Sequence, residues 1–122
     1  MSRVIHFELP ADNPERAAEF YSKVFDWQFQ KWEGPQEYWL VTTGADGQPG
    51  INGGLMRRQQ PGASTCNTIG VASVDDAVAS ITKAGGKNVV PKMPIPGVGY
   101  LAYCSDTEGN VFGLMQPDPK AH

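Results

Sequence analysis

The strongest constraint on the fold of this chain is one order of predicted elements that occurs twice. Between residues 4 and 57, a strand, a helix and three strand-like segments follow one another, and the same order returns between residues 68 and 115. The two stretches share little literal identity, so the repeat is one of architecture. The order predicts an α+β fold in a single domain, residues 1–122. It is built from two βαβββ modules, residues 1–60 and residues 61–122.

Both predicted helices have clear start signals. Asn13 is a capping residue, and Pro14 suits the first helical position. This helix is expected to run from Pro14 to about Phe25. Ser73 has an acidic residue three positions later, which is the spacing of a capping box, and Gly85 provides a left-handed stop.

Eight segments have the composition of strands and are separated by clusters of turn formers. Residues 91–97 contain three prolines, and proline cannot donate to a ladder, so this stretch is expected to be an extended edge or a loop. The predicted strands are Val4–Leu9, Trp27–Trp32, Tyr38–Thr43, Ile51–Arg57, Thr68–Ala72, Asn88–Met93, Gly99–Cys104 and Val111–Met115.

Composition excludes several classes of protein. The formal net charge is −3, and Arg57-Arg58 is the only adjacent basic pair, so we expect no nucleic-acid partner. No stretch reaches the roughly 18 to 20 apolar residues that cross a bilayer, so we expect no membrane partner. The chain begins without the pattern of a secretory signal, and Cys66 and Cys104 are its only cysteines. These features predict a cytoplasmic protein.

The first strand carries the one polar pair whose chemistry suits a site. Side chains alternate along a strand, so the apolar residues at 5, 7 and 9 are expected to face the core. His6 and Glu8 then share the opposite face. Because a nearby carboxylate raises the pKa of an imidazole toward neutral pH, the pair could act as acid and base. The alternative is a polar pair that lines a wet cleft or forms a structural hydrogen bond.

Three stretches resemble the vicinal oxygen chelate superfamily, which includes lactoylglutathione lyase, extradiol dioxygenases, fosfomycin-resistance enzymes and bleomycin-binding proteins. The resemblance implies a curved, mixed, mainly antiparallel sheet with a site between the modules, and a homodimer. The stretches are His6–Ala17 with Phe20-Tyr21 and Val24–Trp27, then Val74-Asp75 with Gly85-Gly86, and Asp106–Leu114.

The metal-using relatives hold a divalent ion through side chains on the first strand and its equivalents. His6 matches the first-strand histidine, but the position of the last-strand carboxylate is Gly113. No histidine occurs in Asn67–Ile69, and no acid occurs in Ile51–Arg57. The resemblance therefore implies a metal-poor site, and we expect no cofactor. The alternative is a divalent metal held in an atypical way by His6 and Glu8.

Further residues are expected to contact a ligand. Aromatic side chains are dense between residues 27 and 39, which suits a flat organic ligand, although a core or a dimer interface explains them equally well. Methionines are also common gap fillers in cores. A glycine permits close approach of a ligand or a facing strand, and Gly113 is expected to leave space where relatives carry a charge. The predicted contacts are Trp39, Asn52, Gly54, Met56, Gly113 and Met115.

Three functions are compatible with these residues. The first is a homodimer that binds a small organic molecule in a cleft, with lyase, isomerase or dioxygenase chemistry if it is an enzyme, and with His6 and Glu8 as the catalytic pair. The second is a drug-binding or metabolite-binding protein without chemistry. The third is a metal-dependent lyase that uses His6 and Glu8 as ligands.

Overall fold

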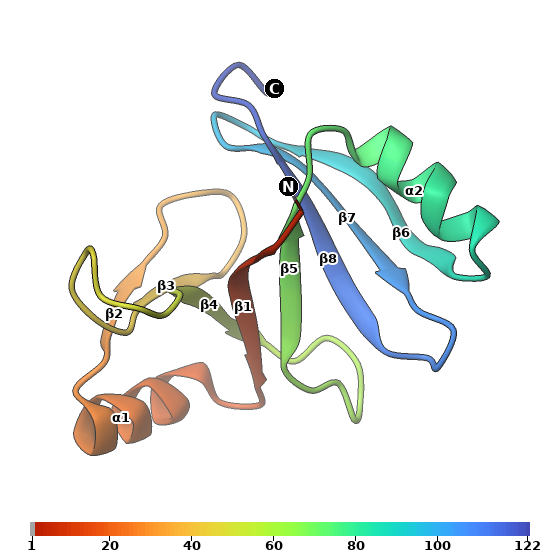
Figure 1. Ribbon diagram of the computed structural model, residues 1–122. Helices are drawn as coiled ribbons and strands as arrows, with labels where there is room; N and C mark the ends of the chain where they lie inside the picture. The colour runs from red at the N-terminus through yellow and green to blue at the C-terminus, as the bar shows by residue number, and fades with distance from the viewer. Residues whose placement is uncertain (1) are drawn as a thin grey trace. The chain divides into compact units, whose positions relative to one another are not determined.

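The computed structural model describes residues 2–122, in which eight strands and two helices follow the predicted order (Figure 1). The chain divides into two compact units. The first unit is His6–Thr65, and the second unit comprises the residues up to Ile5 together with Cys66–His122. The predicted α+β fold of two βαβββ repeats is confirmed.

The first unit contains four strands and one helix. β1 (Val4–Ala11) pairs in parallel with β4 (Gly53–Arg57), which pairs antiparallel with β3 (Trp39–Thr42). β3 in turn pairs antiparallel with β2 (Gln28–Lys31). α1 (Pro14–Phe25) contacts β4 and β2. This unit therefore mixes one parallel pair with two antiparallel pairs.

The second unit repeats this arrangement. β5 (Cys66–Gly70) pairs in parallel with β8 (Val111–Pro117), and β8 pairs antiparallel with β7 (Gly99–Ser105). β7 pairs antiparallel with β6 (Lys87–Ile95), and α2 (Val74–Lys83) contacts β6, β7 and β8. The start of the chain belongs here, since the Gly70 amide donates to the Arg3 carbonyl at 3.0 Å.

The residues predicted to cap and stop the helices, and the proline-rich stretch, behave as the sequence predicts, whereas several strand ends differ by about two residues. Asn13 Oδ1 accepts the Arg16 amide at 3.1 Å, and Ser73 Oγ accepts the Asp76 amide at 3.1 Å. Gly85 has φ +101°, the left-handed conformation that a helix stop favours. β6 includes the proline-rich stretch and lies at the end of the strand order of its unit, with shifts in its register to β7. An edge tolerates proline because one side of the strand needs no ladder.

Each unit has its own core. Val41 and Leu55 are fully buried in the first unit, where Phe7, Leu9 and Trp39 pack around them. The core of the second unit is built on Val74, Ala102, Cys104 and Leu114. Burying a side chain such as Leu55 stabilises the fold by about 1.5–3 kcal/mol. In residues 2–122, neither helix is long and apolar enough to span a bilayer.

Candidate functional site

The alternation of β1 places His6 and Glu8 on the face opposite α1. Phe7 and Leu9 pack into the core of the first unit beside α1 residues, as expected. Ile5 behaves differently, because it is 42% exposed and belongs to the second unit, where it contacts Gly70. Glu8 is buried, with only 8% of its surface exposed, and His6 is half-buried. A carboxylate that is removed from water needs polar partners, and the structure supplies them on this face.

His6, Glu8 and Tyr38 form one hydrogen-bonded cluster. His6 Nε2 lies 2.8 Å from the hydroxyl of Tyr38, which in turn donates to Glu8 Oε2 at 3.4 Å. The imidazole and phenol rings are nearly parallel, with centroids 6.5 Å apart. A hydroxyl has one proton, so when Tyr38 donates to Glu8 it accepts from Nε2–H of His6. The lone pair of the neutral imidazole then lies on Nδ1.

Gly54 makes the room that Tyr38 occupies. Gly54 pairs with Glu8 across β4 and β1, so any side chain at this position would share the face of Glu8. A Cβ at Gly54 would lie 1.7 Å from the Tyr38 hydroxyl oxygen. The ring of Trp32 packs edge-on against the ring of Tyr38, with centroids 6.2 Å apart. The close approach predicted for this glycine is therefore made by Tyr38.

The surroundings of the cluster shift the titration of two of its members. The expectation that a nearby carboxylate raises the pKa of His6 is wrong, because burial lowers that pKa: a charged imidazolium loses hydration there. Burial raises the pKa of Tyr38, and the charge of Glu8 raises it further. At neutral pH the cluster thus contains a neutral imidazole and a protonated phenol. A neutral imidazole is the form that can accept a proton.

The other predicted contacts of the first unit occupy different positions. Met56 lies on β4 two residues after Gly54 and shares the face of Glu8. Trp39 pairs with Leu55 and packs in the core on the face of α1. Asn52 Oδ1 accepts the Thr43 amide at 2.9 Å, which holds the connection between β3 and β4. Among these three residues, only Met56 lies on the face of the cluster, and their ligand contacts stay predictions.

The remaining predicted contacts, Gly113 and Met115, lie on β8 of the second unit. Gly113 is buried and pairs with Thr68 and Tyr103. A Cβ there would lie 3.2 Å from Thr68 Oγ1 and 3.4 Å from the Tyr103 ring. The expectation that Gly113 leaves open space is wrong, because these two side chains fill it.

The donor atoms of the cluster do not fit the metal site of the metal-using relatives. His6 Nε2 and Glu8 Oε2 both contact the Tyr38 hydroxyl, and Gly113 offers no side-chain ligand. Within residues 2–122, no three histidine, cysteine, aspartate or glutamate side chains gather as a group able to hold a metal ion. Structural and catalytic metal sites commonly take three or four such ligands.

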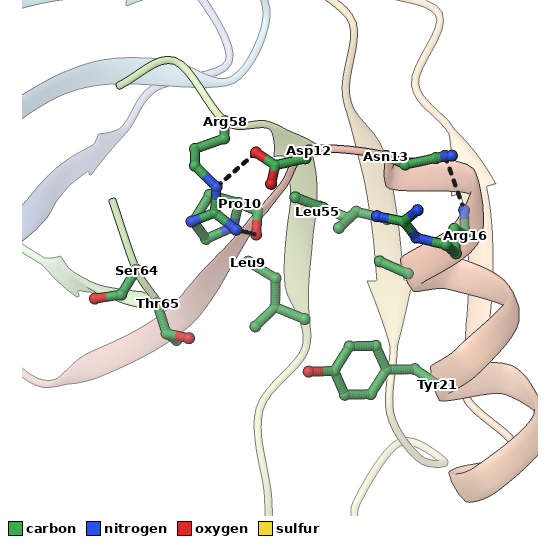
Figure 2. Close-up of a pocket in the computed structure, with 12 residues that line it drawn as sticks. Leu9, Pro10, Asp12, Asn13, Arg16, Tyr21, Leu55, Arg58, Ser64 and Thr65 are labelled. Atoms are coloured by element: carbon green, nitrogen blue, oxygen red, sulfur yellow. Dashed lines mark hydrogen bonds and ion pairs between the residues drawn. The ribbon is translucent and has the colours of Figure 1, made fainter. Parts of the chain in front are cut away.

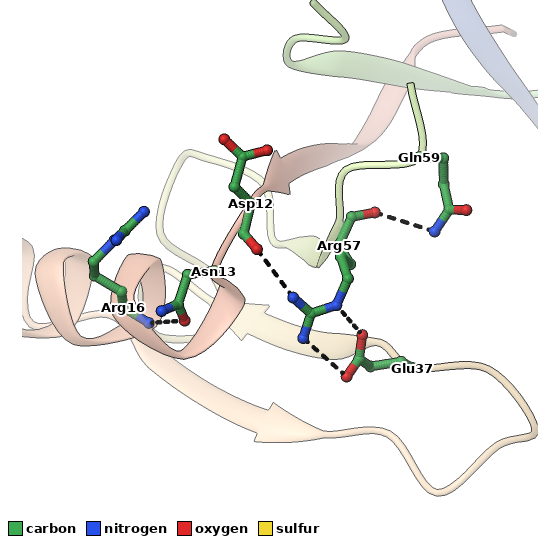
Figure 3. A network of polar contacts seen from close by, with 6 residues as sticks. All are labelled: Asp12, Asn13, Arg16, Glu37, Arg57 and Gln59. Carbon is green, nitrogen blue, oxygen red and sulfur yellow. Dashed lines mark hydrogen bonds and ion pairs between the residues drawn. The ribbon is translucent and has the colours of Figure 1, made fainter. Parts of the chain in front are cut away.

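Two adjacent arginines fix the turn between β1 and α1. Arg57 makes two contacts with the carboxylate of Glu37, at 3.0 and 3.4 Å, and donates to the Asp12 carbonyl at 3.0 Å (Figure 3). The pair lowers the pKa of Glu37. Arg58 contacts the same residue through its side chain, because its guanidinium pairs with the Asp12 carboxylate at 3.0 Å. The two side chains thus join β4 to the start of α1.

Arg58 also borders a pocket of about 400 Å³ in the first unit (Figure 2). The pocket lies between α1 and the segment 58–65, and Leu9 and Ala17 contribute apolar surface to it. Leu9 faces away from Glu8 because adjacent side chains of β1 alternate. Sequence reasoning missed this pocket, since its lining residues come from four separate segments.

Comparisons with known proteins agree with this architecture. The chain matches the family described as the glyoxalase/bleomycin resistance protein/dioxygenase superfamily over residues 3–114. It is 33% identical over 118 residues to "Putative glyoxylase CFP32" of Mycobacterium tuberculosis, a match that covers 93% of this chain and 43% of the relative. It is 30% identical over 113 residues to a glyoxylase-like domain-containing protein of Didymella fabae, covering 88% of each chain.

The fold is also found among solved structures. Methylmalonyl-CoA epimerase from Mycobacterium tuberculosis superposes with a TM-score of 0.70 at 12% identity, covering 95% of this chain and 88% of the epimerase. At this identity the likeness concerns the fold alone. The chain spans less than half the length of the mycobacterial glyoxylase. The repeated βαβββ order, the strand pairing and the family match over residues 3–114 agree, and the chain belongs to the glyoxalase/bleomycin resistance protein/dioxygenase superfamily.

Proposed function

We propose that this chain binds a small organic carbonyl compound at the His6–Tyr38–Glu8 cluster and transfers a proton on it, as isomerases and lyases do. The observation that carries the proposal is the 2.8 Å contact between His6 Nε2 and the Tyr38 hydroxyl, in a cluster that also contains a buried carboxylate. A histidine whose pKa is lowered by burial stays available as a base at neutral pH.

The three side chains have separate roles in this proposal. His6 Nδ1 accepts a proton from the carbon next to the carbonyl group of the ligand. Tyr38 holds Nε2–H and so fixes the orientation of the ring. Glu8 receives the hydrogen bond of Tyr38 and places a negative charge near the imidazolium that forms. The proton returns from Nδ1 to a carbon or oxygen of the ligand, so the reaction needs no added oxidant.

A second candidate is binding without chemistry. It is favoured by the fact that the three polar groups already contact one another, so the cluster is complete without a reacting ligand. The names of the two curated relatives, a glyoxylase and a glyoxylase-like protein, favour the catalytic candidate.

Proton exchange separates the two candidates. A panel of small ketones, α-hydroxy aldehydes and thioesters is incubated with the protein in D₂O, and loss of the proton next to the carbonyl is followed by ¹H NMR. We expect catalysed exchange for at least one compound, reduced about 100-fold or more in His6→Gln. His122→Gln is the matched control, because it removes the second histidine of the chain, which lies outside the cluster. Saturable binding without proton exchange would support the second candidate. If no compound of the panel bound or exchanged its proton, both candidates would be contradicted.

We also propose that the protein is a cytoplasmic homodimer. The mycobacterial relative is more than twice as long as the segment it shares with this chain, so it has room for a second such segment. A second copy of this chain would supply the equivalent mass. Sedimentation equilibrium at micromolar concentration should give about twice the chain mass of 13.2 kDa. A monomer at that concentration would contradict the proposal.

A further inference from the structure

We propose a second ligand site in the first unit, for a small organic monoanion with an apolar body, such as an aryl carboxylate. The site is the pocket of about 400 Å³ between α1 and the segment 58–65. Its volume falls within the range of roughly 300–1,000 Å³ that is usual for small-molecule sites. The proposal does not depend on the cluster of His6, because the two sites involve opposite faces of β1.

One cation in this pocket is available to a ligand. Within residues 2–122, the guanidinium of Arg16 makes no hydrogen bond or ion pair with another group. Figure 2 shows its side chain extending from α1 in the direction of Leu55. A guanidinium offers several N–H donors in a planar arrangement that matches a carboxylate. Arg16 therefore presents both the charge and the geometry for an anion.

The second cation of the pocket is already neutralised. Arg58 pairs with the Asp12 carboxylate at 3.0 Å and donates to the carbonyl groups of Pro10 and Ala63. Asp12 is thus the counter-ion of Arg58, and the pair contributes no net charge to the pocket wall. The single uncompensated charge is that of Arg16, which favours a ligand with one negative charge.

Hydroxyl groups and an apolar surface complete the lining. Among the described residues, the hydroxyls of Tyr21, Ser64 and Thr65 form no hydrogen bond with protein groups. Tyr21 extends from α1, while Ser64 and Thr65 lie on the other side of the pocket (Figure 2). The ring of Tyr21 stacks on the ring of Trp27, with centroids 4.9 Å apart. Together with the Leu9 and Ala17 side chains, these groups suit a ligand that has a polar end and a short apolar body.

The test uses phenylacetate as the probe and ¹H–¹⁵N NMR of the whole chain as the readout. We expect saturable shifts at the amides of Ala17, Tyr21 and Thr65, with a dissociation constant on the order of 1 mM for a ligand of this size. The uncharged phenylacetamide should bind at least five-fold more weakly. Raising the salt concentration should weaken phenylacetate binding, since Arg16 is exposed and its charge is screened.

Variants decide whether Arg16 is the binding group. Arg16→Gln should weaken phenylacetate binding roughly five- to ten-fold, because a charge-assisted hydrogen bond is lost. Lys23→Gln is the matched control: it removes a cation from the same helix at a position that does not line the pocket. His6→Gln should leave this binding unchanged, which separates it from the carbonyl site. Absent saturation, equal binding of phenylacetamide, or an unchanged affinity in Arg16→Gln would each overturn the proposal.

Discussion

The two units carry the same strand pairing but different chemistry at one equivalent position. In the first unit, Glu8 of β1 pairs with Gly54 of β4. In the second unit, Thr68 of β5 pairs with Gly113 of β8. Each glycine lies close to a tyrosine, Tyr38 in the first case and Tyr103 in the second. The repeat therefore preserves a glycine beside a polar residue and an aromatic ring, although the sequences around it differ.

What differs is the ionisable content. The first unit has an imidazole two residues before Glu8, whereas the second has Cys66 two residues before Thr68. The hydroxyl of Tyr38 lies over Gly54, so a Cβ added to Gly54 would be 1.7 Å from the hydroxyl oxygen. Around Gly113 the corresponding contacts are 3.2 and 3.4 Å, so that space is filled more loosely. The shared backbone thus places a hydrogen-bonded histidine, tyrosine and glutamate in one unit, and a threonine and a tyrosine packed around Gly113 in the other.

The largest expected effect is that of Gly54→Ala. The added methyl would occupy the position of the Tyr38 hydroxyl, so Tyr38 would have to rotate away and lose its contacts with His6 and Glu8. We expect the free energy of unfolding to fall by about 2 kcal/mol, from overpacking and lost hydrogen bonds. Urea denaturation followed by far-UV circular dichroism measures this change.

Gly44→Ala is the matched control for that substitution. Its Cβ would meet only the end of the Gln48 side chain, at 3.0 Å, and a flexible side chain can move. A change within about 0.5 kcal/mol is expected. If Gly54→Ala were as mild as Gly44→Ala, the Tyr38 hydroxyl would not occupy the space above Gly54, and the first unit would resemble the second.

The sequence predicted the part of this cluster that lies within one strand. Alternation along β1 is a local rule, so it correctly separated His6 and Glu8 from Phe7 and Leu9. The role of Tyr38 was missed, because it is 30 residues from Glu8 and depends on the missing side chain of Gly54. No local pattern reports such a contact.

The same limit explains the other differences. The aromatic residues between 27 and 39 are close in sequence, yet side-chain parity at the start of β3 places Trp39 in the core, while the preceding residue, Tyr38, lies in the cluster. That parity is fixed only when the register of β3 against β4 is known. The pocket at Arg16 combines four chain segments, and its volume follows from their packing. Fold class depends on repeated local patterns, whereas site geometry depends on register and on distant contacts.

A smaller effect is expected for Gly113→Ala. Its Cβ would be 3.2 Å from Thr68 Oγ1, so the neighbours must yield by a few tenths of an ångström. We expect a loss of less than about 1 kcal/mol in the free energy of unfolding, clearly below that of Gly54→Ala. The same urea titration gives the value. A loss equal to that of Gly54→Ala would show that the two glycines are under equal constraint, and the contrast between the units would fail.

The smallest effect is the dependence of stability on pH that His6 brings to the first unit. Burial lowers the pKa of His6 below its ordinary value of 6.5. Between that lowered value and 6.5, His6 is protonated in the unfolded chain but neutral in the folded protein. The free energy of unfolding therefore rises with pH through this window. Acidification from pH 7.5 to pH 5 should therefore lower the melting temperature of the natural chain more than that of His6→Gln. His122→Gln, which alters the exposed histidine outside the cluster, should follow the natural chain.

Parallel melting curves for the natural chain and His6→Gln would mean that His6 is hydrated. The cluster would then lack the neutral imidazole that distinguishes the first unit from the second.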